Sequence, residues 1–179
     1  METPLSRQGL AGLRAGDRVL LSGRILTGRD AAHRRLCALL DAGLPLPVPL
    51  EGQAMYYVGP CPPRPGEVIG SCGPTTSGRM DAYTPRLLEQ GLLCTIGKGP
   101  RSAEVMEAMR ARGAVYLAAT GGAGALIAGR VRACRPLAFE ELGTEAIHEL
   151  EVEDFPLVVA VDSQGNDLYR TGPQRYRSG

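Results

Sequence analysis

Short strand-like and helix-like segments alternate along this chain of 179 residues, and the alternation constrains the fold more than any other feature. Helical periodicity is clearest over residues 30–42 and 103–112, and apolar runs typical of buried strands occupy residues 92–96 and 115–119. Elements that alternate at such short intervals pack in layers, with helices covering a sheet. The sequence therefore predicts an α/β fold with a mixed sheet, in a chain of single-domain length.

The other expected elements are apolar runs that end at glycine or proline. We expect further strands over residues 18–23, 54–58, 67–71, 131–138, 147–152, 157–161 and 167–169, a helix over residues 80–90, and a short helix that ends at residue 130. A turn at residues 163–166 would join the last two strands as a hairpin. Residues 44–52 should be an extended connector, because each of their three prolines has a fixed φ and no N–H.

The balance of charge excludes several classes of partner. The 20 basic and 19 acidic residues leave a formal charge of +1, so no broad basic face is available to capture nucleic acid or an anionic membrane. No stretch has the pattern of a signal peptide, and the longest largely uncharged one, residues 115–129, is too short to span a bilayer. We therefore expect a cytoplasmic protein with no nucleic-acid or membrane partner.

The five cysteines are irregularly spaced at Cys37, Cys61, Cys72, Cys94 and Cys134. No Cys-x-x-Cys or Cys/His ligand spacing occurs, so the sequence predicts neither a disulfide framework nor a metal site held by this chain. A single cysteine is most often a small buried hydrophobe. Cys72 is the exception to keep in view, because it lies in a glycine-rich loop.

Two loops that lead into predicted helices have the composition of an anion site. Arg29 and Asp30 lie where free backbone N–H groups and the helix dipole favour negative charge, although Asp30 as a plain helix cap explains the pattern too. Residues 73–80 (GPTTSGRM) combine three hydroxyl side chains with Arg79, which suits carboxylate oxygens. A capped helix with a surface arginine is the alternative reading of that loop.

Two further loops follow predicted strands. Lys98 is the only lysine in the chain and lies between two glycines, which favours a specific role for its compact ammonium group. Residues 119–124 (ATGGAG) lack a complete GxGxxG or P-loop pattern, so a tight turn with close helix packing is the preferred interpretation. His148 lies among acidic residues without a second ligand at metal spacing, and we expect a surface or structural histidine.

Taken in order, these segments resemble the β component of the iron–sulfur-dependent class I fumarate hydratase and L(+)-tartrate dehydratase family. The resemblance rests on residues 27–33, 73–81, 96–99, 116–124 and 142–165, of which GPTTSGRMD and GTEAIHE are the most specific. It implies a swivelling β/β/α-type single domain over residues 1–179, with a core at about 15–175. Periodicity alone does not predict that fold.

The resemblance implies an enzyme, a hydro-lyase that reversibly adds water in trans to the double bond of a C4 dicarboxylate. In this family a [4Fe–4S] cluster with one open iron acts as Lewis acid, and three cysteines of an α component hold it. We therefore expect the cluster in a separate α subunit, no metal in this chain, activity only in the complex, and a higher-order hetero-oligomer.

The resemblance also assigns residues. Thr75 matches the family threonine proposed as the catalytic base, a role for which a hydroxyl needs activation by nearby cations. The cations expected to bind the two substrate carboxylates are Arg29, Arg79 and Lys98. Thr75 and Thr76 are also expected to bind substrate, and the expected supporting residues are Asp30, His33, Gly73 and Asp81. Cys72 departs from the pattern, which leads us to expect a small residue such as alanine there.

Two other functions stay open. No residue decides between fumarate and L(+)-tartrate, a difference of one hydroxyl on the substrate. A non-catalytic module that binds a small anion or nucleotide through residues 119–124 is a more distant alternative, and it would bind without a partner and without Thr75. Because part of the active-site wall is expected in the α subunit, we also expect exposed apolar surface and self-association of the isolated chain.

Overall fold

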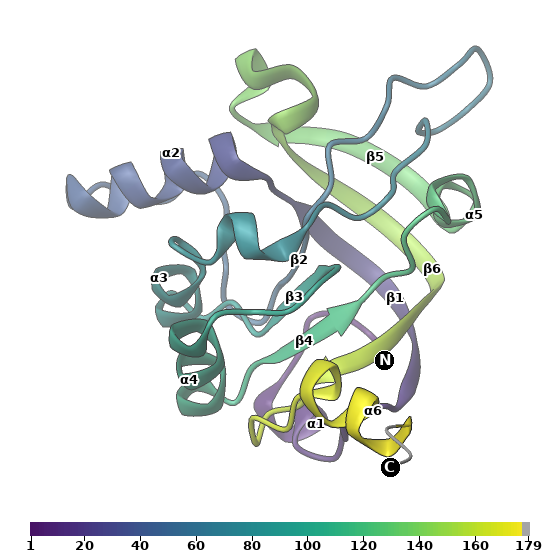
Figure 1. Ribbon diagram of the computed structural model, residues 1–179. Coiled ribbons are helices and arrows are strands. Elements are labelled where there is room, and N and C mark those ends of the chain that lie inside the picture. The colour runs from purple at the N-terminus through teal and green to yellow at the C-terminus, as the bar shows by residue number, and fades with distance from the viewer. Residues whose placement is uncertain (177–179) are drawn as a thin grey trace.

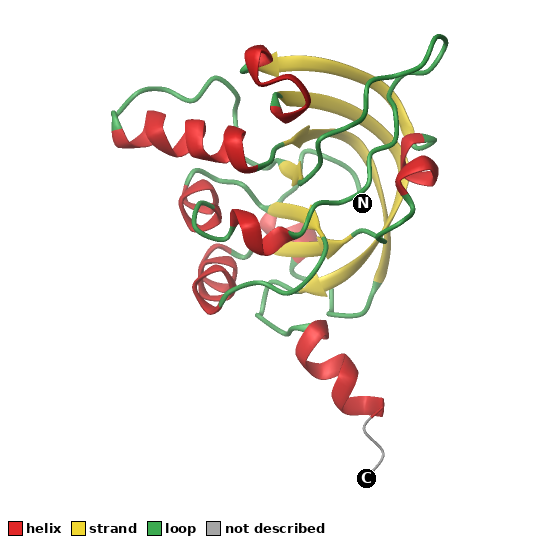
Figure 2. Ribbon diagram, turned by 45° about the horizontal axis from the view of Figure 1, so that its top comes forward, coloured by secondary structure: helices red, strands yellow, loops and turns green. Residues whose placement is uncertain are grey.

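A strongly curved mixed sheet forms the centre of the structure, a computed structural model that describes residues 1–176 (Figures 1 and 2). Its strands are β1 (Arg18–Thr27), β2 (Ala54–Tyr56), β3 (Cys94–Gly97), β4 (Val115–Ala118), β5 (Val131–Ala138) and β6 (Ile147–Val161). They are ordered β1-β2-β3-β4-β6-β5, and β1 to β4 run parallel. Since β6 pairs antiparallel with both β4 and β1, the sheet closes on itself like a barrel.

The helices are α1 (Arg7–Leu10), α2 (Asp30–Asp41), α3 (Thr84–Glu89), α4 (Ala103–Arg112), α5 (Gly124–Ala128) and α6 (Leu168–Tyr176), with 3₁₀ turns η1 (Ser77–Met80) and η2 (Glu140–Glu145). α2, α3 and α4 lie together on one side of the sheet (Figure 1). None of the helices described is long and apolar enough to cross a membrane. The predicted α/β class with a mixed sheet is confirmed.

Alternating side chains of the strands build two hydrophobic cores. Tyr56 and Leu117 belong to the cluster between the strands, whereas their neighbours Tyr57 and Tyr116 belong to the cluster packed under the helices. This alternation follows from the two-residue period of a strand, which sends successive side chains to opposite faces. The consequence for function is that β2 and β4 are held rigidly on both faces, so the loops at their ends start from fixed points.

Two expected strands near the end of the chain are one. The runs at 147–152 and 157–161 form the single strand β6, which pairs with β5, β1 and β4 in turn. Asp154 lies between the two runs in the left-handed region, with φ 51°. The polar residues of this bend interrupt the apolar pattern without ending the strand.

Two expected elements beyond the central strands are wrong. Residues 67–71 form no strand but belong to a loop. The prolines that precede them in this loop lack the N–H groups that pairing with another strand needs. The hairpin at 163–169 is also wrong, because Asp167 makes only an isolated bridge to Val161 and α6 begins directly afterwards. There the Asp162 carboxylate accepts hydrogen bonds from Asn166 and closes the turn that leads into α6.

The helix expected over residues 80–90 is shorter and starts with a separate turn. The chain makes the 3₁₀ turn η1 first, and α3 then begins at Thr84 with Pro85 in its first turn. Proline is tolerated there because the first N–H groups of a helix have no intrahelical partner. The result is that Arg79 lies on a short turn facing α2 and not on the body of α3.

Candidate functional site

The expected site residues gather at one edge of the sheet. Because β1, β2, β3 and β4 run parallel, their carboxyl ends meet at the same edge, where the loops that follow them lie side by side. The four loops singled out in the sequence leave the sheet there or return to it. Contacts between neighbouring loops link them pairwise.

Thr75 and Lys98 are brought together by a short piece of backbone pairing. Thr76 and Lys98 form a parallel β-bridge, in which the Lys98 N–H donates to the Thr75 carbonyl (3.3 Å) and the Ser77 N–H donates to the Lys98 carbonyl (2.8 Å). The Thr75 N–H donates to the carbonyl of Tyr57, just beyond β2 (2.7 Å). The proposed base and the lone lysine are therefore fixed relative to each other by main-chain bonds.

Gly97 makes this pairing possible because it leaves room for it. A Cβ on Gly97 would overlap Ser77 Oγ and would lie 3.1 Å from a ring carbon of Tyr57 and 3.3 Å from the Thr75 carbonyl oxygen. Close approach of two backbones is a common reason for glycine at a strand end. The glycine before Lys98 is thus a packing requirement of the site.

Arg79 and Asp30 join the second loop to the first. Arg79 Nε donates a hydrogen bond to Asp30 Oδ1 at 3.0 Å, and Nη2 lies 2.8 Å from Oδ2, a close ion pair. Asp30 was expected as a possible cap of α2, but the cap residue is Arg29 and the Asp30 carboxylate is committed to Arg79. The side chains of Arg79 and Asp30 are 51% and 23% exposed, so the pair lies at an open surface.

Arg29 lies beside Thr144 and Glu145, at the end of the 3₁₀ turn η2. Glu145 Oε1 lies 3.3 Å from Arg29 Nη2, and Glu145 Oε2 accepts the Ala31 N–H at 3.0 Å. A Cβ on Gly59 would lie 2.8 Å from Arg29 Nη1 and 3.1 Å from the Thr144 carbonyl oxygen. Arg29 is therefore clamped between the loop after β2 and the 3₁₀ turn η2.

The fourth loop touches Lys98 and the glycine of the second loop. A Cβ on Gly121 would lie 4.0 Å from Lys98 Nζ, and one on Gly124 would lie 2.9 Å from the Gly73 nitrogen. The interpretation of residues 119–124 as a tight turn with close packing agrees with these contacts. Among the residues described, Lys98 has no carboxylate within ion-pair distance, unlike Arg29 and Arg79.

The two histidines have structural surroundings. His33 is fully buried, its Nδ1 is 2.8 Å from the Arg29 carbonyl oxygen, and its ring meets Tyr57 edge-on at 5.2 Å. Burial lowers the pKa of His33 to about 4, so the ring is neutral at neutral pH. His148 is half-buried, and its backbone N–H donates to Thr27 Oγ1 at 2.9 Å, in agreement with the structural role expected of it. His33 supports the Arg29 backbone from below.

Asp81 does not lie among the cations of the open edge. Its carboxylate binds Arg101 Nε at 2.7 Å and accepts the Ser102 N–H at 2.6 Å. Sequence reasoning missed Arg101, whose side chain is fully buried, and also the hydroxyl of Tyr116, which contacts both Ser77 and Gly99. Nothing in the sequence marks Arg101, because 19 of the 20 basic residues are arginines.

The thiols of this chain do not fit a cluster site. Cys72 and Cys94 are buried, and burial raises the pKa of Cys72 to about 12, an effect strengthened by the nearby thiols of Cys134 and Cys61. Cluster ligands are thiolates. Within residues 1–176, no three His, Cys, Asp or Glu side chains gather closely enough to hold a metal ion. The carbonyl of Cys72 instead accepts the Tyr56 hydroxyl at 2.6 Å, so this residue anchors its loop to β2.

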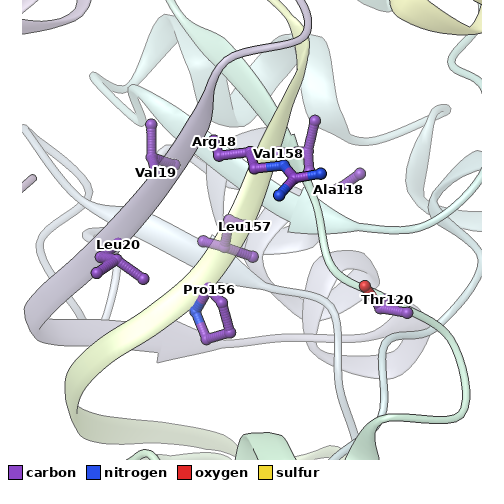
Figure 3. Close-up of a pocket in the computed structure, with 8 residues that line it drawn as sticks. All are labelled: Arg18, Val19, Leu20, Ala118, Thr120, Pro156, Leu157 and Val158. Atoms are coloured by element: carbon purple, nitrogen blue, oxygen red, sulfur yellow. The ribbon is translucent and has the colours of Figure 1, made fainter.

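An apolar hollow lies elsewhere, between β1, β4 and β6 (Figure 3). Its volume is about 250 Å³, and none of the expected site residues line it. One of the residues that line it, Leu20, is a large hydrophobic side chain that is 52% exposed. This hollow lies away from the expected site, so the expectation of exposed apolar surface at the active-site wall stays a prediction.

A family model described as "Fumarase C-terminus" matches residues 1–172. The chain belongs to the fumarase C-terminus family. It is 41% identical to "Fumarate hydratase 2" of Leishmania major over 165 residues, which cover 91% of this chain and 29% of that protein. It is 39% identical to "Fumarate hydratase class I, aerobic" of Salmonella typhimurium over 174 residues, covering 95% of this chain and 30% of that protein.

A second kind of relative has nearly the length of this chain. The "Putative L(+)-tartrate dehydratase subunit beta" of Methanocaldococcus jannaschii is 38% identical over 171 residues, which cover 92% of this chain and 88% of that protein. By contrast, the chain spans about 30% of the length of the two fumarate hydratases. The family therefore contains members in which this domain is one part of a longer polypeptide and a member in which it makes up nearly the whole chain.

Proposed function

We propose that this chain is the β part of a two-subunit hydro-lyase that reversibly hydrates fumarate to (S)-malate. The observation that carries the proposal is the fixed pairing of Thr75 with Lys98 at an edge that also holds Arg29 and Arg79. The fumarate hydratase names of the longer relatives support the reaction class. The archaeal relative of similar length supports the organisation as a separate subunit.

The proposed role of the three cations is to bind and orient the dicarboxylate. A substrate with two carboxylates matches two arginine forks and one ammonium, and charge-assisted hydrogen bonds contribute about 1.5–3 kcal/mol each. Asp30 and Glu145 hold Arg79 and Arg29 in place before substrate arrives. Lys98, which lacks such a partner among the residues described, supplies the uncompensated positive charge that attracts the dianion.

Thr75 is the proposed base in the direction of dehydration. In its alkoxide form, Thr75 Oγ1 takes the proton from the carbon next to the one that loses hydroxide and becomes a neutral hydroxyl. In hydration that hydroxyl gives the proton back to the carbon and is left as the alkoxide. A hydroxyl does this only where nearby positive charge stabilises the alkoxide. The main-chain bond from Lys98 to the Thr75 carbonyl keeps an ammonium-bearing residue beside it. Thr76 and Gly73 form the rest of this substrate-facing loop in the proposal.

The [4Fe–4S] cluster and the rest of the active-site wall belong to the α partner in this proposal. The thiols of this chain do not fit the cluster, so the partner is obligatory for activity. The open position of the Arg79–Asp30 pair supports a second chain closing the site, because solvent screening weakens exposed charges and exclusion of water strengthens them.

The experiment is anaerobic reconstitution of this chain with its α partner, followed by turnover of fumarate and L(+)-tartrate by the complex and by each chain alone. We expect turnover only in the complex, with fumarate the faster substrate. Faster turnover of L(+)-tartrate would assign the second candidate function, which the archaeal relative favours. Turnover by the α chain alone, or no turnover of either substrate by the complex, would contradict the proposal.

A further inference from the structure

We propose that Arg101 is a positioning residue that holds Thr75 and Lys98 in register. This inference rests on the proposed function, because it concerns the same site. The hydrogen bonds of Arg101 go to neither Thr75 nor Lys98, and it acts through the two loops that carry them. It lies three residues after Lys98, at the point where the loop turns into α4.

The first part of the argument is that Arg101 is wholly enclosed and that each of its three side-chain nitrogens donates a hydrogen bond. Its side chain is 0% exposed. Nε donates to Asp81 at 2.7 Å, Nη1 donates to Thr95 Oγ1 at 2.9 Å, and Nη2 donates to Thr84 Oγ1 at 2.9 Å. A buried charge is tolerated only when it is paired and hydrogen-bonded in this way. The guanidinium therefore ties β3, α3 and the end of η1 into one unit.

The second part concerns two tyrosine rings that enclose the guanidinium. Arg101 Cζ lies 5.4 Å from the centroid of the Tyr57 ring and 5.1 Å from that of the Tyr116 ring, within the range of cation–π contact. Both tyrosines are fully buried. A planar guanidinium fits between two rings, whereas an ammonium group makes no comparable stack. Arg101 thus fixes where these two rings lie.

The third part leads from the rings to the reacting loops. Tyr116 places its hydroxyl 2.9 Å from Ser77 Oγ and donates to the Gly99 carbonyl at 2.9 Å. Ser77 and Gly99 flank the bridge between Thr76 and Lys98. The backbone carbonyl of Tyr57, the residue that carries the other ring, accepts the Thr75 N–H. The Tyr116 hydroxyl and the Tyr57 main chain therefore both bond to the segments that carry the proposed base and the lysine.

A structural residue and a positioning residue differ in what their loss changes. If Arg101 only stabilised the fold, a variant that still folds would have fewer active molecules and the same KM. If Arg101 sets the register of the two loops, the folded variant binds and turns over substrate less well, since misplacement of catalytic groups by about 1 Å costs roughly a hundredfold in rate.

The test uses Arg101→Lys in the reconstituted complex, with Arg86→Lys as the matched control. Arg86 also pairs with an aspartate, Asp41, at 2.8 Å, but on the outer surface between α2 and α3. We expect Arg101→Lys to unfold cooperatively and to raise KM and lower kcat, for a fall of about tenfold to a hundredfold in kcat/KM. Arg86→Lys should keep both constants. An Arg101→Lys complex with unchanged KM and kcat per folded molecule overturns the inference.

A second measurement separates this inference from the proposed function. Hydrogen–deuterium exchange of the isolated chain needs neither substrate nor partner, and it reads the Ser77 and Lys98 amides that bond across the loops. We expect faster exchange over residues 75–79 and 97–100 in Arg101→Lys, with α2 unchanged. Uniform or absent change would overturn the positioning role. If the complex turns over no dicarboxylate while this exchange result holds, the proposed function fails and the register role of Arg101 stands.

Discussion

Replacement of Gly97 by alanine tests whether the close pairing of the Thr75 and Lys98 loops shapes this edge of the sheet. The added methyl group would overlap Ser77 Oγ and would press on the Tyr57 ring at 3.1 Å and on the Thr75 carbonyl at 3.3 Å. All three neighbours are held from elsewhere: Ser77 by Tyr116, Thr75 by its bond to Tyr57, and Tyr57 by the packed core. The loop carrying Thr75 must therefore move away from β3.

The expected cost has two parts. Forcing a methyl group into a packed site costs about 1–3 kcal/mol. Displacing Ser77 breaks its hydrogen bond to the Tyr116 hydroxyl, which adds about 0.5–1.5 kcal/mol. We expect Gly97→Ala to lower the free energy of unfolding by about 1.5–4.5 kcal/mol in total. In the complex, displacement of Thr75 should also lower kcat.

The assay is urea unfolding of the isolated chain, with Gly78→Ala as the matched control. Gly78 lies in the turn η1 next to Ser77, is exposed, and has only the Pro100 carbonyl oxygen within 4.0 Å of an added Cβ, so its variant should unfold like the wild type. A Gly97→Ala chain within about 0.5 kcal/mol of the wild type would refute the reasoning, since surface substitutions away from special features stay within that range.

Three further changes probe other parts of the account. Unfolded histidine takes up a proton near pH 6.5, whereas buried His33 stays neutral to about pH 4. Because the unfolded state binds more protons between these pH values, the free energy of unfolding should fall by up to about 3 kcal/mol as pH drops from 6.5 to 4. His33→Gln should flatten this slope in urea titrations at several pH values. Cys61 is exposed and should react first with an alkylating reagent. Cys72 and Cys94 are buried, which raises their pKa values, and should react only on unfolding. Mass spectrometry of Cys61→Ser checks this order of reaction, because the fast phase of alkylation should be lost. Lys98→Arg keeps the charge but loses the compact ammonium group beside Gly121, so KM should rise about tenfold while the melting temperature stays unchanged. An unchanged KM would argue against contact between Lys98 and a substrate carboxylate.

The sequence predicts the parts of the fold that local patterns determine. α4 has the predicted bounds because Ser102 caps it and Gly113, at φ 67°, ends it. The strand β5 is likewise where its apolar run lies. The turn predicted at residues 163–166 is present, but the hairpin is not. The Asp162 carboxylate bonds to Asn166, and the chain continues into α6. A turn motif does not say which element follows it.

The four loops of the site could be found from the sequence because each has an unusual local composition, and the parallel strands bring them to one edge. The residues that pair with the side chains of these loops could not be predicted. Asp30 and Asp81 look alike in sequence, yet one pairs with exposed Arg79 and the other with buried Arg101. Nothing local distinguishes these outcomes, because each depends on contacts between segments far apart in the chain. The closure of the sheet by β6 is long-range in the same way.

The central claim is that Thr75 moves the proton, and one substitution tests it most directly. In the reconstituted complex, kcat for fumarate hydration is compared between wild type, Thr75→Ala and the control Thr171→Ala. The control removes the same atoms from a threonine of α6 whose hydroxyl donates to the Asp167 carbonyl. Loss of a positioned proton-transfer group costs about 10²–10⁴ in rate. The account predicts that loss for Thr75→Ala, with KM little changed and Thr171→Ala fully active. Wild-type kcat in Thr75→Ala would contradict it.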